Sequence, residues 1–115
     1  MDALNYQNFA SRTLVDKPPF QLTDIEIMII WNVIGLAGES GELLESIKHG
    51  IFHQHGLDVV HIKEELGDLL WYAAAICTKL NLDLSKVMEQ NIDKLKMRYP
   101  NGYSSDDSKK RIDKL

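Results

Sequence analysis

Apolar positions along the chain recur with the 3.6-residue period of amphipathic helices. Together with the capping residues, this pattern predicts a short first helix over residues 2–14 and longer helices over residues 24–49, 58–80 and 83–100. Pro18 and Pro19 separate the first two helices, because proline cannot continue a helix. No strand-like alternation of useful length occurs. We therefore predict an all-α domain of the four-helix-bundle type.

Short polar residues and glycine mark the predicted helix ends. The N-terminal caps are expected at the polar residues before each apolar run: Thr23 or Asp24, Asp58 and Asp83. Gly50 and Asn81 are placed where a left-handed residue would end the second and third helices, and residues 51–57 form the predicted loop. Residues 1–103 then make up the domain, and residues 104–115 form a polar tail for which no helix is predicted.

The start of the second predicted helix is apolar on nearly all sides, whereas a bundle helix needs only one apolar stripe. The residues concerned are Ile25, Ile27, Met28, Ile29, Ile30, Trp31, Val33 and Ile34. We interpret the surplus as a subunit interface and expect a homo-oligomer, either a dimer or a tetramer. The alternative is a helix at the centre of a monomer.

Charge and cysteine content exclude several functional classes. The net charge of −4 and a pI near 5.5 argue against binding to a nucleic-acid polymer. Cys77 is the only cysteine and lies in an apolar run, as expected of a buried thiol in the reducing cytoplasm. No secretory signal is recognised at the N-terminus, and the apolar run over residues 25–36 is too short to span a bilayer, so no membrane partner is expected.

The most informative feature is a repeated motif, acid-x-Gly-acid-Leu-Leu, at residues 39–44 and again at residues 65–70. Helix positions three apart share one face, so each motif sets two carboxylates side by side with roughly 4–5 Å of axial rise between them. The two pairs are Glu39 with Glu42 and Glu65 with Asp68. If the helices face each other, the four like charges cost several kcal/mol unless a cation lies between them. All-carboxylate ligation favours Mg²⁺, with Mn²⁺ as a substitute.

Gly41 and Gly67 occupy the same place in both motifs, although glycine inside a helix costs about 1 kcal/mol relative to alanine. We expect a close approach of the two backbones at these positions.

Other interpretations of the acids remain open. They could be solvated charges on two helix surfaces, or part of a non-catalytic helical interaction module, which would leave the duplication unexplained. A di-iron carboxylate bundle would add Glu-x-x-His pairs, and neither predicted acid-bearing helix contains one.

Polar and aromatic side chains elsewhere are candidates for substrate binding. On the fourth predicted helix, Asn91, Lys94 and Arg98 form a stripe beside the apolar seam, and Lys and Arg suit phosphate oxygens. The alternative is a solvated basic face near a helix C-terminus. Lys48 is a weaker candidate of the same kind. Trp31 and Trp71 could stack on a nucleobase, or they could belong to the core.

Four histidines lie around the predicted loop between the second and third helices: His49, His53, His55 and His61. Their spacing matches no standard zinc motif, so they are interpreted as surface residues without a role.

Three segments in order, residues 38–45, 64–72 and 91–100, carry a family resemblance that extends from Asn5 to Tyr103. In these segments the chain closely resembles the MazG-like all-α nucleotide pyrophosphohydrolases. The resemblance implies Mg²⁺-dependent hydrolysis of a nucleoside triphosphate to a monophosphate and pyrophosphate, in a dimer or tetramer. It also implies that four acids hold the metal: Glu39, Glu42, Glu65 and Asp68. Neighbouring activities, dUTPase-like or phosphoribosyl-ATP pyrophosphohydrolase, are the alternatives.

The chain departs from the family pattern at one position. Many relatives carry a further acid just before the first motif glutamate, where this chain has Gly38. The general base is therefore assigned to either Glu39 or Glu42.

Overall fold

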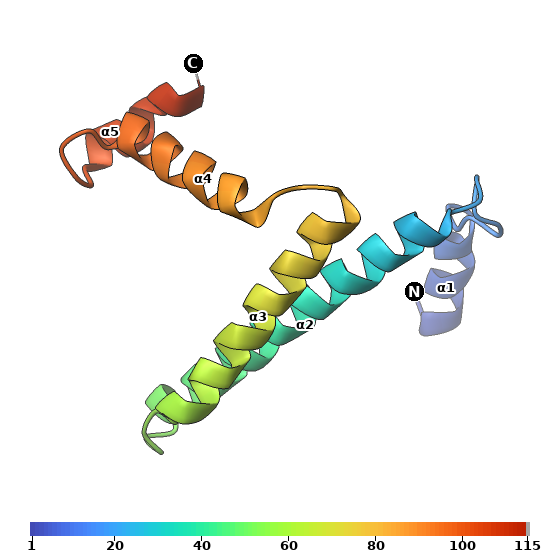
Figure 1. Ribbon diagram of the computed structural model, residues 1–115. Helices are drawn as coiled ribbons and strands as arrows, with labels where there is room; N and C mark the ends of the chain where they lie inside the picture. The colour runs from blue at the N-terminus through green and yellow to red at the C-terminus, as the bar shows by residue number, and fades with distance from the viewer. Residues whose placement is uncertain (115) are drawn as a thin grey trace.

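The computed structural model describes residues 1–114, which are all-α as predicted (Figure 1). The helices are α1 (Ala3–Ser11), α2 (Asp24–Phe52), α3 (Val59–Lys79), α4 (Leu84–Arg98) and α5 (Ser105–Lys110), followed by a 3₁₀ turn, η1 (Ile112–Lys114). The first four correspond in order to the helices expected from the apolar period.

The predicted caps are confirmed. Thr23 and Glu26 form a reciprocal capping box at the start of α2: the Glu26 N–H donates to Thr23 Oγ1 at 3.2 Å, and the Thr23 N–H donates to Glu26 Oε1 at 3.0 Å. Asp58 accepts from the His61 N–H, and Asp83 accepts from the Ser85 N–H. Asn81 adopts φ 56°, the left-handed conformation expected after α3.

Gly50 does not end α2, so that prediction was wrong. The helix continues to Phe52, and Gly50 lies inside it as a buried residue. The Gly56 N–H donates to the Gly50 carbonyl at 3.1 Å, and a Cβ at Gly50 would lie 2.6 Å from the Gly56 carbonyl oxygen. Glycine is therefore used here because the loop after α2 folds back onto the helix.

The polar tail is helical, contrary to the sequence-based expectation. Ser104 caps α5 by accepting from the Asp107 N–H at 3.0 Å, and Arg111 ends the helix at φ 51°. Both α5 and η1 pack against α4. The tail is ordered by these contacts with α4, which local sequence patterns do not reveal.

The helices α2 and α3 lie side by side as an antiparallel hairpin, while α4 leads away from it with α5 and η1 beside it (Figure 1). Across residues 1–114, α4 makes at most slight contact with either hairpin helix. The radius of gyration is 20.6 Å, whereas about 13 Å is expected for a compact chain of this length. One chain alone therefore does not close into a bundle.

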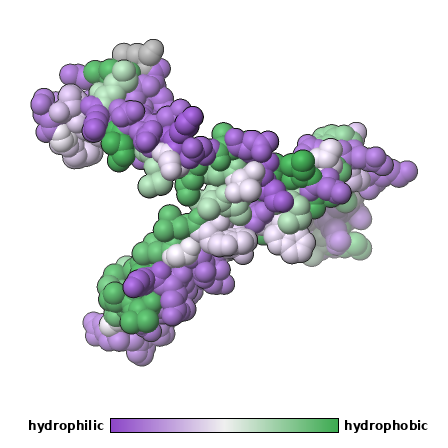
Figure 2. Space-filling view, viewed as in Figure 1, coloured by the Kyte–Doolittle hydropathy of each residue, from purple (hydrophilic) through white to green (hydrophobic). Residues whose placement is uncertain are grey.

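The apolar start of α2 is exposed: Trp31 keeps 67% and Ile34 keeps 66% of its accessible surface. Figure 2 shows hydrophobic side chains gathered along the hairpin beside polar ones. The alternative that this helix lies at the centre of a monomer is therefore wrong for the chain described. An 18-residue stretch of the same helix has a mean hydropathy of 1.3, so by length and composition alone α2 could cross a membrane.

Gly35 on α2 makes room for an aromatic ring of α3. A Cβ at Gly35 would overlap the ring of Tyr72 on α3. This glycine therefore lets the Tyr72 ring lie against α2 about one turn before the first acidic motif.

Candidate active site

The hairpin brings together the four acids predicted from the repeated motif. Desolvation, followed by the negative charges of Glu42, Asp68 and Glu65, raises the pKa of Glu39 above its ordinary value. Glu39 and Glu42 come from α2, and Glu65 and Asp68 come from α3. Two acidic half-sites on separate helices therefore form one electrostatic cluster.

Two oxygens in this cluster are buried without a partner. Glu65 is only 5% exposed, and its Oε2 makes no hydrogen bond. Glu39 Oε2 is in the same state. An unpaired buried carboxylate oxygen is costly, because burial removes its hydration without replacing it. These two oxygens are suited to a hard cation.

The acids are close together but do not form a finished ligand shell. Within residues 1–114, no three histidine, cysteine, aspartate or glutamate side chains are arranged to hold a metal ion as they stand. Glu42 and Asp68 are exposed, so their side chains have room to turn toward a cation.

The close backbone approach expected at Gly41 and Gly67 is not found. A Cβ at either position would meet nothing within 4 Å. The tight contact lies instead at Gly35, which the repeated motif does not include. Within the described residues, both motif glycines face open space.

His61 is a site residue that the sequence interpretation missed. Its Nε2 lies 2.8 Å from Glu65 Oε1, four residues further along α3. A close contact to one oxygen can orient the carboxylate and leave the other, Oε2, free for a ligand. The sequence pattern that could have identified His61 is its position four residues before Glu65, because residues four apart lie on the same face of a helix.

The predicted phosphate ligands are not gathered at the acids. Lys48 on α2 lies 3.8 Å from Glu45, and both side chains are exposed. Asn91 and Lys94 lie on α4, which leads away from the hairpin. Arg98 is held by Asp113 of η1, with Nε donating to Oδ1 at 2.6 Å and NH2 donating to Oδ2 at 2.7 Å.

Both tryptophans lie on the surface of the hairpin and not in a core. Trp71 keeps 62% of its accessible surface and meets Tyr72 edge to face, with ring centroids 5.1 Å apart. Trp71 and buried Asn32 line a groove of about 380 Å³ between α2 and α3. Trp31 lines a separate hollow of about 420 Å³ on α2. Both rings are thus open to a ligand or a partner.

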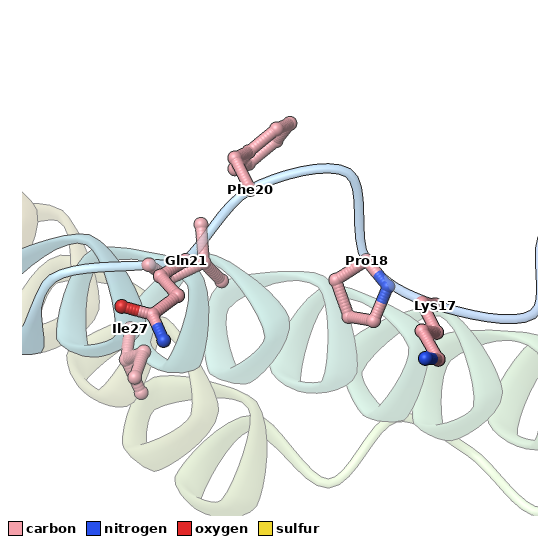
Figure 3. Close-up of a pocket in the computed structure, with 6 residues that line it drawn as sticks. Lys17, Pro18, Phe20, Gln21 and Ile27 are labelled. Carbon is pink, nitrogen blue, oxygen red and sulfur yellow. The ribbon is translucent and has the colours of Figure 1, made fainter.

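A hollow of about 700 Å³ lies between the α1–α2 linker and the start of α2, lined by Lys17, Pro18, Phe20, Gln21, Leu22 and Ile27. In Figure 3 the Phe20 ring projects away from Ile27. None of the predicted site residues lines this hollow, so it is not part of the acidic site.

Comparisons with known proteins identify the family of the chain. The model of the MazG nucleotide pyrophosphohydrolase domain matches residues 32–103, a segment that contains all four acids. The Gene 37 protein of Mycobacterium phage L5 is 32% identical over 103 residues, covering 84% of this chain and 88% of that protein. No solved structure matches the chain. From the domain match and the paired acids of α2 and α3, we conclude that the chain belongs to the MazG nucleotide pyrophosphohydrolase family, whose enzymes generally depend on a divalent metal.

Proposed function

We propose that the protein hydrolyses nucleoside triphosphates to nucleoside monophosphate and pyrophosphate with Mg²⁺, and that Mn²⁺ can substitute. The observation that carries the proposal is the pair of buried, unpartnered oxygens, Glu39 Oε2 and Glu65 Oε2, within a cluster of four acids. The donors are all carboxylates, which suits Mg²⁺ better than zinc.

The four acids would bind the metal, and one of the two glutamates on α2 would also act on the attacking water. Glu39, Glu42, Glu65 and Asp68 would hold the metal, with His61 orienting Glu65 through the 2.8 Å contact. The bound Mg²⁺ would supply charge neutralisation and polarisation of the phosphoryl oxygens. Glu39 or Glu42 orients the attacking water and accepts its proton.

The nucleobase has a place on the hairpin in this proposal. Trp71 offers a ring face, and Asn32 offers an amide in the same groove. Asn32 lies seven residues before Glu39, which is about 10 Å along α2. That separation suits a nucleotide with its phosphates at the acids and its base in the groove. Trp31 is the second stacking candidate.

The phosphate-binding residues support a site completed by a second copy of the chain. Asn91 and Lys94 lie on α4, which makes at most slight contact with the hairpin of its own chain within residues 1–114. An α4 helix from a partner would cover the exposed apolar surface of α2 and bring these polar groups to the acids. Lys48 lies on α2 of the same chain as the acids, so its position does not depend on a second subunit. The proposed assembly is therefore a homodimer or a tetramer.

We also propose a cytoplasmic protein that binds neither a membrane nor a nucleic-acid polymer. Cys77 is a buried free thiol on α3, as suits a reducing compartment. Although α2 has the length and hydropathy to span a bilayer, its second half carries Glu39, Glu42 and Glu45. Charges inside a bilayer are costly, so a partner subunit is a better cover for α2 than lipid.

The test is product analysis with ribo-, deoxyribo- and modified nucleoside triphosphates in Mg²⁺ or EDTA. We expect monophosphate and pyrophosphate in equal amounts, and no diphosphate. Glu42→Gln should lower kcat by about 10²–10⁴-fold, the contribution of a positioned acid or base. Glu45→Gln, an exposed acid on the same helix, is the matched control and should stay near wild type.

Other outcomes would contradict the proposed site or the proposed substrate. Equal activity of Glu42→Gln and Glu45→Gln, or activity that persists in EDTA, would sink the proposed site. Turnover restricted to dUTP or to phosphoribosyl-ATP would support the acidic site but would identify a narrower substrate than nucleoside triphosphates in general. No turnover of any substrate by folded protein would favour a non-catalytic helical module.

A further inference from the structure

Three histidines gather at the tip of the α2–α3 hairpin, away from the acids. The His49 ring centroid lies 5.2 Å from that of His53 and 4.4 Å from that of His55. His49 lies seven residues after Glu42, which is about 10 Å along α2. The cluster is therefore separate from the carboxylate site and has no part in the proposed hydrolysis.

The helix and the loop each contribute to this cluster for a physical reason. His49, in the last turn of α2, and His53, its C-cap, are four residues apart, a spacing at which a helix can present two imidazoles to one metal ion. The interpretation from sequence, that the spacing of these histidines matches no metal-binding motif, overlooked this pair. His55 is returned to the helix by the loop, which is pinned by the hydrogen bond from the Gly56 N–H to the Gly50 carbonyl. Gln54 and Gly56 have φ of 57° and 80°, which turns the chain sharply enough for this return.

We propose that His49, His53 and His55 bind a borderline divalent transition-metal ion, of which Zn²⁺ is the first to test. Two imidazoles bound to one ion through bonds of about 2.0–2.1 Å place their ring centroids roughly 4.5–5.3 Å apart. Both observed separations, 5.2 and 4.4 Å, lie at or close to this range. Imidazole nitrogen prefers such ions to Mg²⁺, so the two sites would select different metals.

Side-chain rotation would complete the site. The His49 and His55 rings are stacked, with their planes 12° apart, so their nitrogens do not yet point at one centre. All three histidines are exposed and are free to change rotamer without disturbing a core. The backbone supplies the proximity, and the ion would supply the final orientation.

The test measures Zn²⁺ binding to the full, untagged chain by isothermal titration in excess Mg²⁺, with histidine ring signals followed by NMR. We expect one Zn²⁺ per chain and concerted shifts of His49, His53 and His55. His49→Ala and His53→Ala should each weaken binding at least about tenfold, the lower end of what even supporting residues cost at metal sites. His61→Ala, which removes the fourth histidine, should bind as wild type does.

A backbone variant tests the role of the loop separately. Gly50→Ala introduces a Cβ against the Gly56 carbonyl and should move His55 away while leaving both helix histidines in place. We expect weaker Zn²⁺ binding with an unchanged helical circular dichroism signal. Wild-type affinity in Gly50→Ala would remove His55 from the site. No binding to wild type, or equal losses in His49→Ala and His61→Ala, would overturn the proposal.

Discussion

The guanidinium of Arg98 and the carboxylate of Asp113 form a bidentate ion pair that joins α4 to η1. The Arg98 side chain is 13% exposed and the Asp113 side chain 1%, in a chain with few buried groups. The hydrogen bonds between the two side chains, together with their opposite charges, raise the pKa of Arg98 and lower the pKa of Asp113 to about 2. In the structure, the Nε and NH2 groups of Arg98 donate to this carboxylate.

The pair predicts how the C-terminal segment responds to acid. Because the folded-state pKa of Asp113 lies below its ordinary 3.8, the pair contributes its full stability above that pH and loses it as the pH falls toward about 2. We expect the amide chemical shifts of residues 105–110 to lose their dispersion across this range. Asp113→Asn should show the same loss at neutral pH.

Asp106→Asn is the matched control, because Asp106 is an exposed acid of α5. It should keep the wild-type acid transition. An Asp113→Asn protein with an intact C-terminal segment at neutral pH would show that other contacts hold α5 and η1 in place.

Substitution by alanine should have opposite effects on stability at Gly35 and at Gly38. Gly35→Ala drives a Cβ into the Tyr72 ring, and overpacking of this kind costs about 1–3 kcal/mol. Gly38→Ala meets nothing within 4 Å, so it should gain about 0.5–1 kcal/mol from improved helix propensity. Urea denaturation followed by circular dichroism measures both. A second change, Tyr72→Ala, should cancel part of the Gly35→Ala cost, and strictly additive losses would contradict the contact.

The sequence predicted those features that depend on local pattern. Helix positions follow from apolar period, and the caps at Thr23, Asp58 and Asp83 follow from the preference of short polar side chains for helix starts. The pairing of the acidic motifs followed from their repetition on two helices joined by a short loop. These inferences need no knowledge of how distant segments meet.

Features that depend on distant contacts were missed. The helix at Ser105–Lys110 packs against α4, and the η1 turn that follows it is held to α4 by the Arg98–Asp113 pair, whose members are fifteen residues apart. Gly50 was expected to end a helix, whereas it makes room for the Gly56 carbonyl. The histidine cluster required the loop to fold back. In each case the structure depends on a contact with a residue that the period and capping rules do not consider.

The exposed apolar start of α2 predicts an oligomer that a single charge should dissociate. Burial of one isoleucine side chain contributes about 1.5–3 kcal/mol, and Ile34→Glu removes this contribution. A two-fold interface contains the residue twice, so the loss is doubled and association should weaken roughly 100-fold or more. Analytical ultracentrifugation without detergent measures this. Val59→Glu, at an equally exposed apolar residue on the hairpin tip, should leave the assembly intact. A wild-type monomer, or wild-type protein that needs detergent to stay in solution, would contradict the interface.

Two lysines on α4 test whether this helix binds the triphosphate. Lys94 is half-buried beside the apolar seam, whereas Lys96 is exposed. If Lys94 bonds a phosphate oxygen, Lys94→Gln removes a charge-assisted hydrogen bond worth about 1.5–3 kcal/mol, and KM should rise at least about tenfold. The value of kcat should change much less, because the bond is present in both ground and transition states. Lys96→Gln, with the same loss of charge, should keep the wild-type KM. Equal increases in KM for both variants would mean that α4 acts only through its overall charge, and the substrate contact would then pass to Lys48.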